Sequence, residues 1–373
     1  MSEEKMKDKR EIKQTVTVDP WGSNEVILDD KLFKEFGLRP IKKSDYLNHY
    51  FFERNFIVAH RDFDKIKNAI ETKKPFLQMT GIASSGPFHL GHKIDIDLFL
   101  FFKKMGAKSF FGVCDIDAYT SRPDTKVPSM KKAKEMAVQN TADLLALGLE
   151  KNDIYIQSKK EPRYYEFTFE LSKKITENAF KAIYGHMDLG KVSANLLQYA
   201  DILHQQLPEY LGPMPSITGI GLEQDPHARA TRDLARKLPY NFVLPSFIYF
   251  KHLGGLKQGK KMSASEPDTA IFLNDSEKDI KKKINKSFSG GRVTIEEHRK
   301  LGGIPEIDKA FEVLSFHHPD TKFVNKIYDE YKTGKMLSSE LKSITIEFLT
   351  KLLKEHQEKV NQFKGLAKKI VEP

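Results

Sequence analysis

The chain has little of what disulfide-bonded, zinc-binding and membrane proteins require. Its 373 residues include a single cysteine, Cys114, which excludes an internal disulfide and a zinc site built from several thiolates. No apolar run approaches the roughly 20 residues that span a bilayer, since the longest, IDIDLFLFF at 94–102, contains two aspartates. Residues 1–14 are charged and have no apolar centre, unlike a signal peptide. We therefore expect a cytoplasmic protein with no membrane partner.

The loop at 81–92 also lacks both common glycine-rich phosphate motifs, GxxxxGK[ST] and GxGxxG. It reads GIASSGPFHLGH and stands between a predicted buried strand at 75–81 and a predicted helix at 90–106. A second buried strand is expected at 108–117. Strand, helix and strand in this order predict a parallel βαβ unit, which places the loop at the amino end of a helix, where unpaired N–H groups favour an anion.

Further strands are expected at 153–158 and 215–225, each bordered by helical sequence. This alternation predicts an α/β fold, a Rossmann-like doubly wound parallel sheet with a helical insertion at about 120–212. After Ser276 the strand patterns stop, and apolar residues at helical spacing predict a C-terminal α-helical domain. The predicted division is a basic flexible tail at 1–18, an N-terminal extension at 19–74, a Rossmann domain at 75–276 and a helical domain at 277–373.

Basic residues outnumber acidic ones, with 61 Lys plus Arg against 51 Asp plus Glu and a formal net charge of +10. An excess of this sign favours a polyanionic partner such as nucleic acid. Because both signs are interspersed along most of the chain, a solvated lysine-rich surface explains the charge equally well. Charge alone leaves both interpretations open.

His89 and His92 stand three apart in the loop at 81–92. A zinc site is disfavoured, because no third His, Cys or carboxylate stands nearby at ligand spacing, and no metal ligands are predicted. Structural or solvated histidines are the ordinary alternative for such a pair. The third interpretation is phosphate binding, in which imidazole N–H groups donate to phosphate oxygens and the glycines of the loop let the backbone come close.

A second motif, KMSAS at 261–265, follows a glycine-spaced lysine loop that begins at Gly254. PFHLGH and KMSAS resemble the HIGH and KMSKS motifs of class I aminoacyl-tRNA synthetases, and they occur in the same order. Further segments resemble the eukaryotic and archaeal tryptophanyl-tRNA synthetases: VDPWGSNEVILDDKLFKEFG, FIVAHRDFDKI, GLEQDPHARATRDLA and SFSGGRVTIEEHRKLGG. The last of these distinguishes that family from the tyrosine-specific sister family, and the resemblance covers nearly the whole chain after residue 16.

The resemblance implies a tryptophan–tRNA ligase, in which the carboxylate of tryptophan attacks the α-phosphorus of ATP and the tRNA then takes the aminoacyl group. It implies that His89, His92 and Lys261 are catalytic, with the loop at 257–266 closing on the phosphates and Mg²⁺ sharing their charge. The second lysine of KMSKS is Ala264 here, so the implied charge rests on Lys261. The implied ATP site consists of Thr80, Gly81, His89, Gly91, His92, Lys261, Met262, Ser263 and Ser265.

The implied tryptophan pocket consists of Met79, Gly112, Asp117, Gln198, Asp201 and Gln224. Asp117 would face the substrate ammonium group, and a strand-end turn residue is its plain alternative. The indole N–H needs an acceptor, because a buried unpaired donor costs about 1–3 kcal/mol. Gln198 and Asp201 share one face of a predicted helix, and the sequence leaves open which of them accepts. A tyrosine and a glutamine of the family pocket are replaced by Met79 and Gly112, so tyrosine specificity stays an alternative.

The resemblance further implies a tRNA(Trp) partner, a symmetric homodimer and anticodon binding by the helices at 277–373. Basic side chains there would follow RNA phosphates, although a solvated face explains them equally well. These residues are Lys286, Arg292, Arg299, Lys300 and Lys309. A non-catalytic RNA-binding paralogue is the alternative of a different class, but such a chain would have no chemical need for His89, His92 and Lys261 together.

Overall fold

The computed structural model describes residues 33–34, 36–259, 262–263 and 266–372. The predicted tail at 1–18 lies outside the described residues, as do Lys261 and Ser265 of the implied ATP site. All other residues of the two implied sites lie within the described part of the chain.

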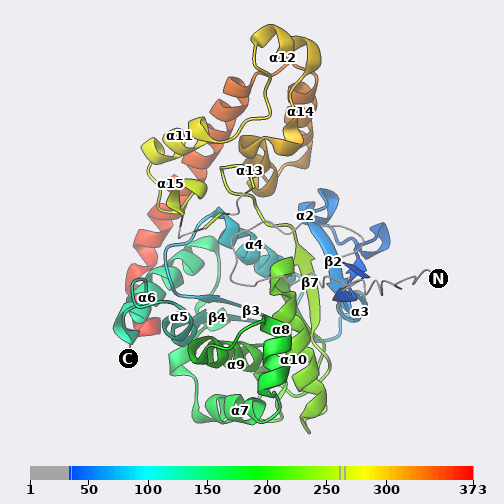
Figure 1. Ribbon diagram of the computed structural model, residues 1–373, viewed down its shortest axis with the longest axis vertical. Helices are drawn as coiled ribbons and strands as arrows, with labels where there is room; N and C mark the ends of the chain where they lie inside the picture. The colour runs from blue at the N-terminus through cyan, green and yellow to red at the C-terminus, as the bar shows by residue number, and fades with distance from the viewer. Residues whose placement is uncertain (1–32, 35, 260–261, 264–265, 373) are drawn as a thin grey trace, which may run out of the picture.

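Seven strands form one mixed sheet in the order β1-β2-β7-β6-β3-β4-β5 (Figure 1). Their bounds are β1 Arg39–Pro40, β2 Ile57–Arg61, β3 Leu77–Ala83, β4 Lys108–Cys114, β5 Ile154–Ile156, β6 Ser216–Gly221 and β7 Ser246–Phe250. Strands β7, β6, β3, β4 and β5 are parallel neighbours, which confirms the predicted Rossmann-like sheet. Strand order reverses between β3 and β6, so a ligand crevice is expected at the carboxyl ends of these two strands.

Helices connect the strands and extend beyond them. Their bounds are α2 Tyr50–Glu53, α3 Phe63–Glu71, α4 Leu90–Lys104, α5 Asp115–Ser121, α6 Met130–Leu147, α7 Pro162–Ser172, α8 Glu177–Tyr184, α9 Leu189–Leu203, α10 Asp225–Lys237, α11 Glu277–Lys286, α12 Ile295–Leu301, α13 Lys309–His317, α14 Thr321–Lys332 and α15 Ser338–Val371. The predicted βαβ unit is β3-α4-β4. Helix α4 packs so closely on β6 that a Cβ at Gly219 would lie 2.5 Å from Leu98 Cδ2, which explains the glycine there.

Three predicted strands are shorter than expected: the one predicted at 153–158 spans 154–156, and the shortening of the other two moves two implied site residues. The strand predicted at 108–117 ends at Cys114, because the Asp115 carboxylate accepts hydrogen bonds from the Ile116 and Ser158 N–H groups at 3.1 and 2.9 Å and starts α5. Asp117 therefore lies in the first turn of a helix. The strand predicted at 215–225 spans 216–221, which leaves Gln224 in the short 3₁₀ turn before α10.

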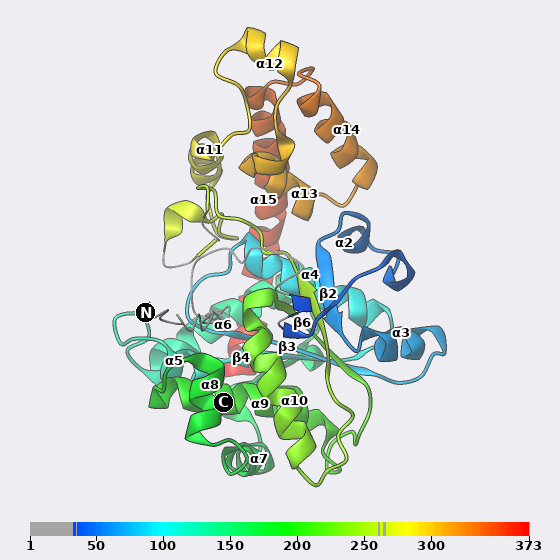
Figure 2. The same ribbon diagram turned by 45° about the vertical axis from the view of Figure 1, so that its right-hand side comes forward.

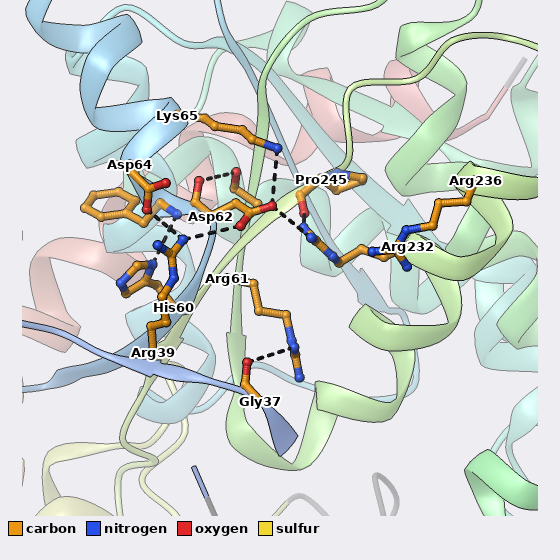
Figure 3. Close-up of polar contacts among 12 residues, drawn as sticks. Gly37, Arg39, His60, Arg61, Asp62, Asp64, Lys65, Arg232, Arg236 and Pro245 are labelled. Atoms are coloured by element: carbon orange, nitrogen blue, oxygen red, sulfur yellow. Dashed lines mark hydrogen bonds and ion pairs between the residues drawn. The ribbon is translucent and has the colours of Figure 1, made fainter. Parts of the chain in front are cut away.

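The predicted N-terminal extension contributes to the sheet, since β2 pairs antiparallel with β7. Figure 3 shows how the end of β2 is fixed: Asp62 accepts from Arg39, Lys65 and Arg232 at 3.3, 3.2 and 2.8 Å. Burial alone would raise the pKa of Asp62, but the hydrogen bond and charge of Arg232 lower it. The carboxylate thus joins this edge to helix α10 as a charged group.

The C-terminal helices are tied to the sheet by α15. This helix has 34 residues, which makes it about 50 Å long at 1.5 Å per residue. Figures 1 and 2 show it running from helices α12 and α14 down to α6. Buried side chains of α13 and α15 belong to the same apolar cluster as those of the sheet and α4. The predicted C-terminal helices are confirmed, and their core is continuous with that of the sheet.

Candidate active site

One cavity of about 600 Å³ lies beyond the carboxyl ends of β3, β4 and β6. It brings together eleven of the implied site residues: Met79, Thr80, Gly81, His89, His92, Asp117, Gln198, Asp201, Gln224, Met262 and Ser263. Gly91 and Gly112 are not on its wall. The cavity therefore lies where the reversal of strand order predicts a ligand crevice.

The histidine pair starts helix α4. His89 is the N-cap residue: its Nδ1 accepts from the Gly91 N–H at 3.1 Å, and the His92 Nδ1 accepts from the His89 N–H at 3.1 Å. The two rings stack with their centroids 3.7 Å apart. A Cβ at Gly91 would lie 2.9 Å from the His89 ring, so only glycine allows this arrangement.

This geometry sets the hydrogen-bonding role of the rings. Burial, together with the charges of His89, Lys126 and Arg122, lowers the pKa of His92 well below its ordinary value of 6.5, so the ring is neutral at neutral pH. In a neutral imidazole whose Nδ1 accepts, the proton is on Nε2. His92 therefore presents an N–H donor rather than a second acceptor, which suits a phosphate oxygen.

Two cavity residues, Arg122 and Lys126, were not predicted from the sequence. They lie between α5 and α6, and both line the cavity. Burial and the charge of Arg122 lower the pKa of Lys126, as expected for two neighbouring cations. Within the described residues the buried Arg122 Nε has no hydrogen-bond partner. The segment SRPDTK has no motif spacing, so only its basic pair could have pointed to an anion site.

Asp201 is the centre of a buried hydrogen-bond cluster. Its Oδ1 accepts from the hydroxyls of Tyr155 and Tyr164, both at 2.7 Å. Its Oδ2 accepts from Gln157 Nε2 at 2.9 Å and from the Cys114 thiol at 3.7 Å. Burial raises the pKa of Asp201 to about 6, although the hydrogen bonds from Tyr155, Tyr164 and Gln157 lower it. A carboxylate has about four acceptor positions, and protein groups use all of them here.

Gly112 lies behind this cluster. A Cβ at Gly112 would be 2.8 Å from the Tyr155 hydroxyl, so the tyrosine takes the space that a larger residue on β4 would fill. Gln198, by contrast, lies on the cavity wall, and no described residue donates to its side-chain amide or accepts from it. Of the two indole acceptors suggested by the sequence, only Gln198 retains unused hydrogen-bonding groups within the described part of the chain.

Asp117 is held by Gln157 and Ser121, and Gln224 lies at the start of α10. The Asp117 N–H donates to Gln157 Oε1 at 2.9 Å, and its carboxylate accepts from the Ser121 hydroxyl at 2.9 Å. Burial raises the pKa of Asp117, against the effect of that hydrogen bond. Gln224 directly precedes Asp225, the first residue of α10.

Asp225 is anchored by residues of strands β2 and β7. Its fully buried carboxylate pairs with Arg61 of β2 at 2.8 Å and accepts from the Tyr249 hydroxyl of β7 at 2.6 Å. Arg229, one turn further along α10, adds a third contact at 3.0 Å. The predicted N-terminal extension thus fixes the start of α10 and the turn that carries Gln224. No sequence pattern predicted this contact, because Arg61 and Asp225 are far apart in the chain.

Comparison with known proteins agrees with this geometry. The sequence-family model of class I tRNA synthetases (W and Y) matches residues 71–354 of this chain. The tryptophan–tRNA ligase of Methanocaldococcus jannaschii is 39% identical over 368 residues, which cover 95% of this chain and 97% of that protein.

The chain belongs to the tryptophanyl-tRNA synthetase family.

Two more relatives support the assignment of this chain to the tryptophanyl-tRNA synthetase family. The tryptophan–tRNA ligase of Aeropyrum pernix is 37% identical over 95% of this chain and 98% of its own length. The crystal structure of the tryptophanyl-tRNA synthetase from A. pernix K1 superposes with a TM-score of 0.85 at 36% identity, covering 92% of this chain and 96% of that one. The structure of the Plasmodium falciparum tryptophanyl-tRNA synthetase gives a TM-score of 0.82 at 29% identity, covering 93% and 95%.

No three His, Cys, Asp or Glu side chains of residues 33–34, 36–259, 262–263 and 266–372 gather where they could hold a metal ion. None of the described helices is long and apolar enough to cross a membrane.

Proposed function

We propose that this chain is a tryptophan–tRNA ligase that activates L-tryptophan with ATP in the cavity described above and then transfers it to tRNA(Trp). The observation that carries the proposal is the meeting of two unlike groups of residues on one cavity wall. A histidine pair at a helix start, next to two cations, suits phosphates. A half-buried carboxylate and an amide, Asp117 and Gln198, suit an amino acid.

The phosphate half of the cavity acts on the leaving group. Negative charge on the α-phosphate oxygens and on pyrophosphate increases as the tryptophan carboxylate attacks, and the Nε2–H groups of His89 and His92 donate to it. Arg122 and Lys126, which line the same cavity, help to neutralise it. Lys261, outside the described residues, has the same role in this proposal. Mg²⁺ would be held mainly by the phosphates of ATP, where it would share their negative charge.

The amino-acid half selects the substrate. Asp117 accepts from the substrate ammonium, and Gln198 accepts from the indole N–H. Asp201 takes part indirectly: its carboxylate orients Gln157, whose Oε1 in turn holds the Asp117 N–H. Gln224 completes the wall from the turn fixed by Arg61 and Asp225.

The test is pyrophosphate exchange with a panel of amino acids. We expect exchange with tryptophan and a specificity constant for tyrosine lower by roughly a hundredfold or more. Equal or greater exchange with tyrosine would assign the chain to the tyrosine-specific sister activity. No exchange with any amino acid, with RNA binding retained, would identify a non-catalytic paralogue.

The partners follow from the same proposal. The chain works in the cytoplasm as a homodimer, with the helices at 277–373 contacting the anticodon through unpaired bases and phosphates. Sedimentation measures the oligomeric state, and aminoacylation of tRNA(Trp) transcripts with altered anticodon bases measures the anticodon contact.

A further inference from the structure

Two consecutive residues of α15, His356 and Gln357, contact helix α6 and the segment that follows the KMSAS motif. His356 Nε2 lies 3.0 Å from Asp143 Oδ1 of α6, and both side chains are less than one-tenth exposed. One turn earlier on α6, the buried Asn140 side chain donates to the Gly86 carbonyl oxygen at 3.0 Å. Gly86 belongs to the loop that leads into His89. The C-terminal helix is therefore joined to that loop through α6.

Gln357 makes the second connection. Its Nε2 donates to the carbonyl oxygens of Leu273 and Asp275, both at 3.0 Å. An amide nitrogen carries two protons, so both donors are used and the side chain has one defined orientation. These carbonyls lie eight and ten residues beyond Ser265, in the segment that follows the KMSAS motif.

The segment held by Gln357 is paired directly with the histidine motif. The Leu273 N–H donates to the Phe88 carbonyl and the Leu90 N–H donates to the Ile271 carbonyl, both at 2.9 Å. These two bonds flank the bridge between His89 and Phe272. Residues 88–90, which include His89, and residues 271–273, which follow KMSAS, thus form one short antiparallel pairing, here called the joint. Gln357 contacts this joint from the outside.

We propose that Gln357 is a positioning residue for adenylate formation. By fixing two carbonyls of the 271–275 segment it sets the register of the joint, and so the distance between the His89 start of α4 and the base of the KMSAS loop. Transition-state donors lose effect when displaced by a fraction of an ångström, whereas ground-state ATP binding tolerates it better. The inference rests on the proposed function, since it concerns the first step of that reaction.

The test separates hydrogen-bond donation from shape. Gln357→Glu keeps the shape but turns the donor into a charged acceptor facing two carbonyls; Gln357→Leu removes the donor; Gln357→Lys restores one. Lys342→Met is the matched control, because Lys342 Nζ, also on α15, donates to two carbonyls at 2.9 and 3.0 Å on Asn285 and Ser287, which do not line the cavity. The readouts are the single-turnover rate of adenylate formation, the KM for tryptophan and the melting temperature.

We expect Gln357→Glu and Gln357→Leu to slow adenylate formation by roughly tenfold or more, with the KM for tryptophan within about twofold of the parent. Gln357→Lys should recover most of the rate, and Lys342→Met should leave it within about twofold. The proposal is overturned if the Glu and Leu variants stay within about twofold of the parent rate, or if Lys342→Met slows the reaction as much as they do at an equal loss of melting temperature. A parent protein without tryptophan-dependent exchange would instead reject the proposed function itself.

Discussion

Asp201→Asn is the substitution for which the structure makes the sharpest prediction. The parent carboxylate receives four donors, two on each oxygen. An asparagine can keep Oδ1 for Tyr155 and Tyr164, but its NH₂ group must then face Gln157 Nε2 and the Cys114 thiol. Gln157 cannot turn to offer its oxygen without releasing the Asp117 N–H that it holds at 2.9 Å. The substitution therefore places the new NH₂ group against two other hydrogen-bond donors in a buried site.

The expected cost follows from these contacts. A buried donor left without an acceptor costs about 1–3 kcal/mol, so we expect the free energy of unfolding to fall by about 2–3 kcal/mol. Gln198→Ala should behave oppositely, because its amide bonds to no described residue. Losing its hydrogen bond to the indole N–H should weaken tryptophan binding by about 1–2 kcal/mol, or roughly five- to thirtyfold, with stability nearly unchanged.

Denaturant unfolding and calorimetric titration of tryptophan measure the two quantities on the same preparations. The Asp201→Asn variant should retain most of its tryptophan affinity per folded molecule, and the Gln198→Ala variant should retain its unfolding midpoint. If Asp201→Asn abolished tryptophan binding at full stability while Gln198→Ala changed neither property, Asp201 would be the indole acceptor and the reasoning above would be wrong.

Burial raises the pKa of Asp95, on the cavity wall, to about 7. This carboxyl is neutral below that pH and charged above it, so the KM for ATP should rise between about pH 6 and 8, and Asp95→Asn should flatten the profile. Because the folded pKa lies above the ordinary 3.8, the folded state binds this proton more tightly, and stability should fall as pH rises from about 4 to 7. Lys126→Ala should slow adenylate formation, measured by single turnover, about ten- to a hundredfold, with a smaller effect on the KM for tryptophan. An unchanged rate would show that Lys126 does not act in this step. Arg61→Ala leaves the buried Asp225 short of a partner and should cost about 3 kcal/mol in chemical unfolding, whereas Arg236→Ala, whose ion pair on the same helix is exposed, should cost under about 0.5 kcal/mol; equal losses contradict the anchoring role.

The local patterns of the sequence predicted much of this fold. The strand at 75–81 and the helix at 90–106 lie close to β3 and α4, because continuous apolar runs and a glycine stop are read from neighbours in the chain. The end of β4 was placed three residues too late. The side chain that ends it, Asp115, is held by Ser158, and such a distant partner leaves no local signal.

The site divides in the same way. Residue types and spacing identified the motifs that gather in the cavity, since a phosphate needs donors at a helix start whatever the rest of the chain does. Spacing could not show that Arg122 and Lys126 line the same cavity as the histidines, nor that Tyr155 occupies the space above Gly112. Those facts depend on which strands are neighbours.

The sequence by itself determined the family, the order of the elements and the chemical kind of each group, because these are properties of short stretches of chain. It could not determine whether Gln198 or Asp201 has hydrogen-bonding capacity left for a ligand. A side chain's remaining acceptors are known only after all its partners are counted, and the partners of Asp201 come from β4, β5, the turn after β5 and α7. Only the tertiary structure, which brings these four segments to one carboxylate, shows that protein groups use the acceptor positions of Asp201.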